Sequence, residues 1–522
     1  MEAIQATEKV QQKFWWSKAA IIIVSIIIAL VGVPLICGVK ASYLYTDILF
    51  FILIFVLILS IAYIRTQAHL SNAWKQVFSN KVAMISVVIL LSYIFIATLD
   101  SLHFKVPLKI SPSQKNVPLQ VNYAPIESAL DLLLLPVRQT VNAKGESVLF
   151  PLKLKDERTY SAPMATHAYA KETINLGKGK VKRIYPRLKY GGKHLQPSQS
   201  KGLDILLKIL TGVLVATFVW SVLVVFLVLI LNRFNYHLVL PDLKKLFRGD
   251  FEIPWNVAAW TLLVILLFSF SLYWLSFYYH VFGTDKVGED TLYQAVKSIR
   301  TGIIIGTLTT LVMLPFAVFL GIAAGYFKGW VDDMIQYLYT TLSSIPGVLL
   351  IAASVLMIQV YIDNSGVQYT DTVKGDVKLL ALCVILGITS WTSLCRLLRG
   401  ESLRIREVEY IQAAQAFGVH DMTIIKRHII PNIMHLVLIV VVLDFSGLVL
   451  AEAVLSYIGI GVDAKMNSWG NMINGARLEM ARDPMVWWSL VAAMSFMFTL
   501  VLAANMFSDA VRDAFDPRLR TG

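Results

Sequence analysis

Ten long apolar stretches constrain the fold of this 522-residue chain more than any other feature. A run of about 20 apolar residues is long enough to cross the roughly 30 Å hydrocarbon core of a bilayer as a helix. Hydrophobic residues make up 57% of the chain and charged residues 16%, whereas soluble chains average about 45–50% and about 25%. The sequence therefore predicts an all-α polytopic membrane protein with about ten transmembrane helices. The stretches lie near residues 19–39, 48–64, 82–99, 209–231, 255–279, 301–326, 336–361, 379–395, 433–458 and 485–507.

Two of these stretches have special features. The first follows three lysines within residues 1–18 and has no small-x-small cleavage site, so it is expected to be an uncleaved transmembrane helix rather than a signal peptide. The seventh is interrupted by Ser343, Ser344 and Pro346. Such interruptions are tolerated where neighbouring helices satisfy the freed backbone groups.

The distribution of Lys and Arg predicts the orientation. With the N-terminus inside, the inner short segments hold 20 basic residues and the outer short segments hold nine. Because translocating positive charge is disfavoured, both termini are predicted to be cytoplasmic. Because successive connections alternate between the two sides of the membrane, residues 101–203 form an outer loop, although they hold 17 basic and six acidic residues. Loops longer than about 60 residues cross largely regardless of charge, so a basic extracytoplasmic insertion of roughly 100 residues is expected.

The function of this insertion has more than one interpretation. Its basic residues alternate with Tyr185 and Tyr190, a composition that would suit nucleic acid, but an outward-facing loop does not meet nucleic acid. A solvated small domain or arm is the first expectation, and a docking surface for a binding protein or an anionic envelope component is the alternative. Segment 129–137 is too short to span the bilayer and is expected to pack within that domain.

The inner segment 396–432 is the longest connection on the cytoplasmic side. Its pattern predicts a helix, a turn with positive φ at Gly418, a second helix capped by Asp421, and Pro431 at the start of the next transmembrane helix. Ala413 and Ala414 leave a flat surface that another protein can approach closely. On this physics alone, an amphipathic hairpin lying on the bilayer is an equal alternative.

The spacing within this segment is similar to a known signature. Gln412, Ala413 and Ala414, followed by Gly418 and then Pro431, resemble the EAA motif of bacterial ABC importer permeases, with Gln412 in place of the usual glutamate. In that family the motif forms a coupling helix that docks into a groove on the ATPase subunit. The resemblance implies a coupling role for Gln412, Ala413, Ala414, Gly418, Val419, His420, Asp421 and Pro431.

Further stretches resemble the second permease subunit of the dipeptide, oligopeptide and nickel importers. The segment that enters the sixth apolar stretch matches a G-T-D-x-x-G-R-D pattern, with Glu289 where arginine is usual. The resemblance implies a type I importer core of six helices, which leaves two extra helices before it and two inserted within it. Both additions cross the membrane an even number of times, so each preserves the in/out parity. The matching stretches are 74–100, 280–302, 324–332, 450–461, 468–472 and 509–520.

The resemblance also predicts how the chain is divided. Five segments are expected: an N-terminal extension with two extra helices, the first core helix, the basic insertion, two inserted helices, and the remaining permease core, which contains the coupling loop 396–432. Their respective bounds are 1–73, 74–100, 101–204, 205–279 and 280–522.

Catalytic and metal-binding patterns are absent from the sequence. A chain that hydrolyses ATP needs a phosphate cradle of the form G-x-x-x-x-G-K-[ST], and no segment has it. No enzyme activity, metal site or resident cofactor is therefore expected, and ATP with Mg²⁺ would bind partner subunits. Asp444 and Glu452 lie within the ninth apolar stretch, where an ionisable group is a functional candidate by default. The alternative is that they cap or pair with neighbouring helices.

The resemblance implies a permease subunit that forms the translocation pathway of an ATP-driven peptide importer in the bacterial inner membrane. Its expected partners are a second permease subunit, two ATPase subunits, an extracytoplasmic solute-binding protein and the lipid bilayer, with no nucleic acid. The alternative function is a membrane scaffold or regulator that keeps the permease core without transporting.

Overall fold

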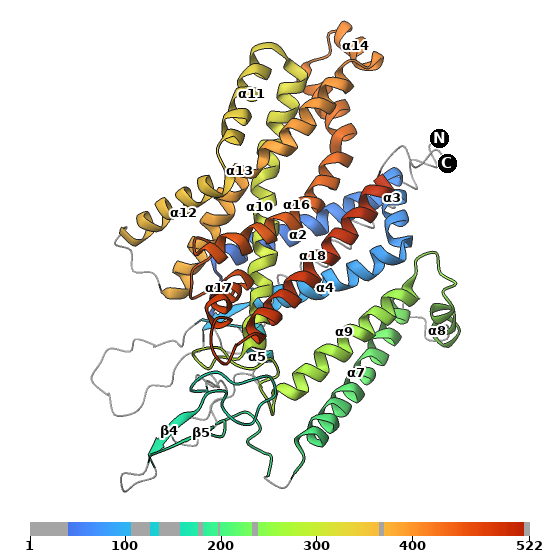
Figure 1. The fold of residues 1–522 in the computed structure, drawn as a ribbon. Coiled ribbons are helices and arrows are strands. Elements are labelled where there is room, and N and C mark those ends of the chain that lie inside the picture. The colour runs from blue at the N-terminus through green and yellow to red at the C-terminus, as the bar shows by residue number, and fades with distance from the viewer. Residues whose placement is uncertain are drawn as a thin grey trace, which may run out of the picture. The chain divides into compact units, whose positions relative to one another are not determined.

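The computed structural model describes residues 40–105, 126–134, 157–175, 181–196, 199–231, 239–364 and 370–515. Their contacts divide the chain into two compact units. Described residues up to 43, together with 55–300 and 467–503, belong to unit 1, and residues 44–54, 301–466 and 504–515 belong to unit 2. Three long helices contribute to both units (Figure 1), namely α2 (Tyr45–Thr66), α10 (Thr291–Phe327) and α18 (Trp488–Phe515).

Much of unit 1 consists of the two helices predicted to be inserted and the helix predicted to be the first of the core. Helices α7 (Lys201–Leu231) and α9 (Trp255–Ser276) pack along each other, and α9 also packs against α4 (Lys81–Asp100). Trp220 in α7 donates a hydrogen bond of 2.7 Å to the carbonyl of Ala259. The shorter helices of this unit are α3 (Ala68–Ser79), α5 (Ala129–Leu133), α8 (Val239–Arg248) and α17 (Trp469–Glu479).

Unit 1 also contains the described strands. Strands β1 (Lys40–Ala41), β2 (His103–Lys105) and β3 (Glu127–Ser128) form a small antiparallel sheet. Strands β4 (Glu172–Asn175) and β5 (Val181–Ile184) form a hairpin in which Thr173 pairs with Arg183. The first sheet joins the segment before α2 to the segment after α4, and the hairpin belongs to the basic insertion.

A buried ion cluster holds the start of the insertion against the core helices of unit 1. Lys297 of α10 lies 2.8 Å from Asp100 of α4 and 3.0 Å from Asp131 of α5. Tyr293 donates a hydrogen bond of 2.8 Å to Asp131, and Ser128 donates one of 2.6 Å to Asp100. The apolar side of α5 packs on α4 and α10. Within the predicted segment 129–137, the described residues 129–134 pack on α4 and α10, and residues 135–137 lie outside the described residues.

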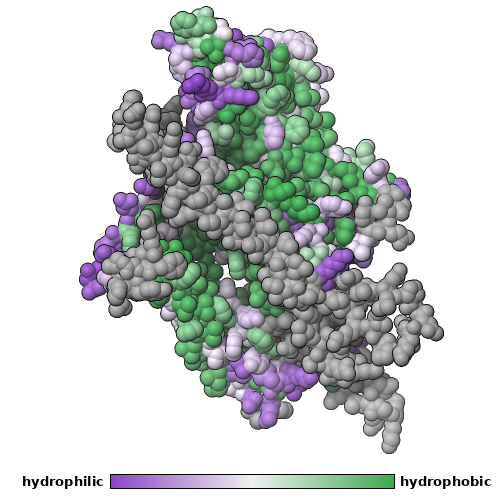
Figure 2. All heavy atoms as spheres, turned by 180° about the vertical axis from the view of Figure 1, so that it is seen from behind, coloured by the Kyte–Doolittle hydropathy of each residue, from purple (hydrophilic) through white to green (hydrophobic). Residues whose placement is uncertain are grey.

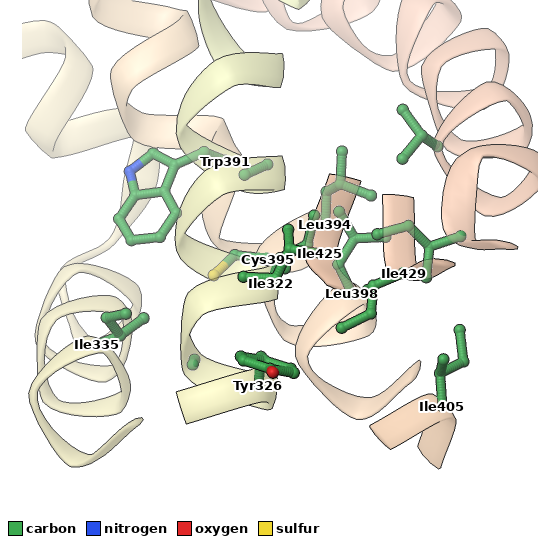
Figure 3. Packing of buried hydrophobic residues seen from close by; sticks show 14 of the residues in the cluster. Ile322, Tyr326, Ile335, Trp391, Leu394, Cys395, Leu398, Ile405, Ile425 and Ile429 are labelled. Carbon is green, nitrogen blue, oxygen red and sulfur yellow. The ribbon is translucent and has the colours of Figure 1, made fainter. Parts of the chain in front are cut away.

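Most of the remaining helices lie in unit 2. These are α11 (Gly329–Ser344), α12 (Gly347–Asn364), α13 (Asp371–Arg406), α14 (Glu409–Ala416), α15 (Asp421–Ile424), the π-helical turn η2 (Ile425–Ile429) and α16 (Ile430–Ile458). Its main apolar cluster joins α10, α13 and η2 (Figure 3). There Tyr326 and Ile322 lie beside Leu398, Ile425 and Ile429.

The described residues contain nine helices that are long and apolar enough to cross a membrane. Nine of the ten predicted stretches correspond to them, and the stretch at 19–39 lies outside the described residues. The predicted bounds 336–361 were wrong, because α11 ends at Ser344 and α12 begins at Gly347. Pro346 lacks an N–H and keeps Ile345 extended, which separates the two helices.

The outer surfaces of these helices suit a lipid environment. Leu206, Leu210, Leu214 and Phe218 recur every four residues along α7, and each exposes more than half of its surface. Hydrophobic residues also form broad areas on the face drawn in Figure 2. Apolar side chains facing outward along a continuous helix are expected where lipid replaces water.

Gly212 provides a test of how α7 and α9 pack. A Cβ atom at this position would lie 2.9 Å from the Cα of Ser271, which is backbone and cannot rotate away. We expect Gly212→Ala to lower the free energy of unfolding of the purified protein by about 1–3 kcal/mol, as overpacking does. Thermal unfolding in detergent measures this change.

Gly202 in the same helix is the matched control, because a Cβ atom added there would have no neighbour within 4 Å. Gly202→Ala is expected to leave the unfolding midpoint equal to wild type or slightly higher, since alanine favours the helix by about 1 kcal/mol. Equal midpoints for the two variants would contradict the close α7/α9 contact.

Candidate functional site

The predicted coupling loop forms two short helices around a glycine turn. Helix α13 continues to Arg406, so the loop proper begins there and passes through α14 into α15. Gly418 adopts φ 71°, a left-handed conformation that favours glycine. The N–H of Gly418 donates to the carbonyl of Gln415, and that of Val419 donates to the carbonyl of Ala414. These bonds close the end of α14 and turn the chain toward the second helix.

One detail of the predicted loop was wrong. His420 caps the second helix, since its Nδ1 accepts a hydrogen bond of 3.2 Å from the N–H of Met422. Asp421, the predicted cap, is the first residue of α15. Pro431 lies at the start of α16, as predicted, although the helical run is continuous from Asp421 through η2 into α16. The π-helical turn precedes a proline that cannot donate a hydrogen bond, and such a rearrangement accommodates proline within a helix.

Tyr326 at the end of α10 joins both halves of this loop. Its hydroxyl donates to Asp421 Oδ1 at 2.6 Å and accepts from Gln415 Nε2 at 3.2 Å. The guanidinium carbon of Arg406 lies 5.7 Å from the centre of its ring. The Tyr326 side chain is buried and therefore has few alternative positions. Sequence reasoning missed this residue, although it lies in the stretch 324–332 that carries part of the resemblance.

Ion pairs fix the helices beside the loop. Arg399 of α13 makes two hydrogen bonds to Asp332 of α11, at 2.5 and 2.7 Å. Those bonds lower the pKa of Asp332, although burial alone would raise it. Lys328 pairs with Glu407 at 2.5 Å just after α13. A two-pronged Arg–carboxylate pair resists rotation, so α11 and α13 hold each other in one orientation.

The outward side of the loop is available to another protein. Ile411 and Ile424 are fully buried and attach the loop to unit 2, whereas Gln412 and Ala413 are exposed and Ala414 is half-buried. Phe417 exposes 87% of its surface, which is unusual for a large apolar side chain. An open depression at the second helix of the loop is lined by Met422, Thr423, Lys426 and Arg427.

The two intramembrane carboxylates are not brought together. Glu452 is buried and accepts a hydrogen bond of 2.6 Å from Ser456, whose hydroxyl accepts one from the N–H of Val462. Asp444 lies eight residues earlier in α16, a separation of about 12 Å along the helix axis, and is only half-buried. Among the residues that the structure describes, no group of His, Cys, Asp and Glu could hold a metal ion.

Comparison with known proteins gives the family. Residues 317–521 match the family described as "Binding-protein-dependent transport system inner membrane component". The glutathione transport system permease protein GsiD of Pectobacterium atrosepticum is 30% identical over 242 residues, which cover 46% of this chain and 74% of that protein. The chain belongs to this family. It is a multi-pass permease subunit of an ABC importer and not an enzyme.

Two further relatives agree with this assignment. The oligopeptide transport system permease protein OppC of Haemophilus influenzae is 28% identical and is covered over 71% of its length. The dipeptide transport system permease protein DppC of Bacillus subtilis is 28% identical and is covered over 69%. Each match spans 46% of this chain. The family predicted from the sequence is confirmed, and the scaffold alternative is not favoured.

The Tyr326 hydroxyl can be tested without any partner subunit. Tyr326→Phe keeps the ring against Arg406 and removes the hydrogen bonds to Gln415 and Asp421. Each lost bond contributes about 0.5–1.5 kcal/mol. We expect faster amide hydrogen exchange over residues 409–424, and unchanged exchange within α13.

Tyr337→Phe is the matched control, because this tyrosine of α11 exposes 75% of its surface. Its exchange pattern is expected to equal that of wild type. Unaltered exchange over 409–424 in Tyr326→Phe would contradict the positioning function of the hydroxyl.

Proposed function

We propose that this chain forms half of the translocation pathway of an ATP-driven importer whose cargo is peptides. The observation that supports the proposal most strongly is the exposed, anchored loop from Gln412 to Asp421, which projects from buried Ile411 and Ile424. The cargo class comes from the relatives, which are named for glutathione, oligopeptide and dipeptide transport. Peptide-like compounds and nickel are the variants of the same class.

The proposed assembly contains a second permease subunit, two ATPase subunits and an extracytoplasmic solute-binding protein. ATP and Mg²⁺ bind the ATPase subunits, which contact the loop residues Gln412, Ala413, Ala414 and Phe417. Both termini of this chain are cytoplasmic, as the excess of Lys and Arg in the alternate short connections indicates. The coupling loop then lies on the same side as the ATPase subunits.

Closure of the ATPase pair moves the coupling loop, and the loop moves the helices of unit 2. Tyr326 ties the loop to α10, and the Arg399–Asp332 pair ties α13 to α11, so these elements move together. Rigid-body rotation of packed helices is an established way to alternate between inward and outward access. The loop therefore moves as one rigid body with these helices instead of bending independently of them.

Asp444 is the better of the two carboxylate candidates for a place along the pathway. Glu452 is already engaged by Ser456 near the end of α16, which is the expected position of a structural cap. Asp444 is half-buried within an apolar helix, where an ionisable group is costly and is usually retained for function.

Gly418 tests the coupling directly. Valine is strained at φ 71°, because its branched Cβ disfavours the left-handed region. In a strain that lacks its own copy of this permease, we expect wild-type protein to restore uptake of a labelled peptide and Gly418→Val to reduce it at least about tenfold, the effect of roughly 1.4 kcal/mol of lost coupling. ATPase subunits should still co-purify with the variant.

Gly418→Asn is the matched control, since asparagine tolerates the left-handed conformation better than other side chains and no atom lies within 4 Å of the added Cβ. Its uptake is expected to stay close to wild type. Normal uptake by Gly418→Val, with ATPase subunits bound, would refute the coupling assignment. Failure of the wild-type protein to restore uptake of any peptide would refute the cargo class.

A further inference from the structure

The described part of the basic insertion is attached firmly to the core segments of unit 1. The N–H of Ser161 donates to Thr284 Oγ1 at 2.7 Å, and the N–H of Thr284 donates back to the carbonyl of Ser161 at 3.1 Å. Trp488 donates to the carbonyl of Thr284 at 2.9 Å, and Tyr169 donates to the carbonyl of Met485 at 3.0 Å. The insertion therefore has a defined position over the segments that enter α10 and α18.

A buried carboxylate organises the turn that follows the hairpin. Glu157 accepts hydrogen bonds of 2.9, 2.8 and 3.2 Å from the N–H groups of Lys189, Tyr190 and Gly191. Its Oε1 also lies 3.5 Å from Nε2 of His280. Burial raises the pKa of Glu157, but His280 and the three N–H donors outweigh burial and hold this pKa at about 2.

The neighbouring groups complete this buried network. His280 Nδ1 lies 2.7 Å from Asp290. Burial lowers the pKa of His280, but the hydrogen bond with Asp290 and the negative charge of Glu157 nearby raise it to about 9. Gly288 passes so close that a Cβ there would lie 1.9 Å from the carbonyl oxygen of Glu157. The close contact between the described part of the insertion and the segment 280–302 therefore requires a glycine at position 288.

Within residues 157–196 the acidic Glu157 is buried, whereas several basic side chains are exposed. Residues 157–196 hold nine Lys and Arg against two acidic residues, and one of those two is the buried Glu157. Tyr185 exposes 51% of its surface and lies 5.5 Å from Nζ of Lys171. We define the basic face as the exposed residues Lys171, Arg183, Lys189 and Lys193.

The basic face lies at the end of unit 1 where α7 begins. In Figure 1, the β4–β5 hairpin is near that end, whereas α8 lies at the opposite end of the α7/α9 pair. With the orientation proposed above, this end faces away from the cytoplasm. The described part of the insertion, which carries the basic face, contacts the segments that lead into α10 and α18.

We propose that the basic face is the docking surface for an acidic patch on the extracytoplasmic solute-binding protein. The inference rests on the proposed function for the identity of that partner. A surface on which lysine and arginine outnumber acidic side chains accelerates the encounter with a surface of opposite charge, and the effect weakens as salt screens it. A rigid platform with an exposed tyrosine beside its cations also loses little conformational freedom on binding.

The test uses the complete transporter in nanodiscs of neutral lipid and the purified solute-binding protein of the same transporter. Lys171, Arg183, Lys189 and Lys193 are replaced together by Gln, which removes charge but keeps a long polar side chain at each position. We expect the association rate to fall at least about tenfold at low salt and to approach wild type at high salt. The maximal ATPase rate at saturating binding protein should not change.

The matched control replaces four exposed cations elsewhere by Gln, namely Lys75, Lys81, Lys244 and Arg248. Its association rate should stay within about twofold of wild type, because distant charges are screened. A variant carrying only Lys171→Gln and Lys189→Gln should show an intermediate loss. Equal thermal unfolding midpoints show that the variants are folded.

Several results would overturn the proposal. If the association rate of the wild type does not depend on salt, the basic face does not take part in docking. The same conclusion follows if the fourfold variant associates as fast as the wild type. A difference that appears only in nanodiscs of anionic phosphatidylglycerol assigns the face to lipid instead. If wild-type transporter assembles with its ATPase subunits but never responds to the binding protein, the proposed importer function itself fails.

Discussion

The hydrogen bonds of the Tyr326 hydroxyl are the interaction on which the coupling account depends. The loop from Glu407 to His420 is too short to build a core of its own, so its position is set by what it is attached to. Ile411 and Ile424 supply apolar attachment, but apolar contacts alone permit sliding. One buried hydroxyl accepts a hydrogen bond from Gln415 and donates one to Asp421, on either side of Gly418, and the two bonds together hold the loop in place.

In the proposed mechanism, a small surface on the loop moves much larger helices. Movement of the exposed residues near Phe417 would reach α10 through Tyr326 and α13 through the continuous chain. The Arg399–Asp332 pair carries the same movement to α11. Because packed interfaces change between discrete arrangements, elements that are held together in this way rotate as a body instead of deforming.

The sequence predicted features that depend on local chemistry. Bilayer thickness requires long apolar runs, so nine described helices could be located in advance, and the positive φ at Gly418 follows from the residue type. Contacts between distant residues could not be predicted in this way. Tyr326 meets Asp421 across 95 positions, and neither periodicity nor spacing marks that pair. Choosing Asp421 as the cap failed for the same reason, since its carboxylate is occupied by Tyr326.

For the insertion too, the sequence predicts the number of charged residues but not where they lie in the structure. Its excess of basic residues was readable from the sequence, but the network of Glu157, His280 and Asp290 was not. The structure places the acidic groups of that network inside and leaves the basic face outside. The described part of the insertion is therefore attached to the segments that lead into α10 and α18.

Spin-label distances between the loop and α11 test the central claim most directly. Labels at Glu409, the first residue of α14, and Trp330 of α11, both exposed in unit 2, would be introduced into a chain whose three native cysteines are replaced. The assembled transporter would be measured without nucleotide and in its ATP-trapped state. Coupling through a rigid lever predicts the same distance distribution in both states. A shift approaching one helical turn, about 5 Å, would show that the loop moves independently and would contradict the account.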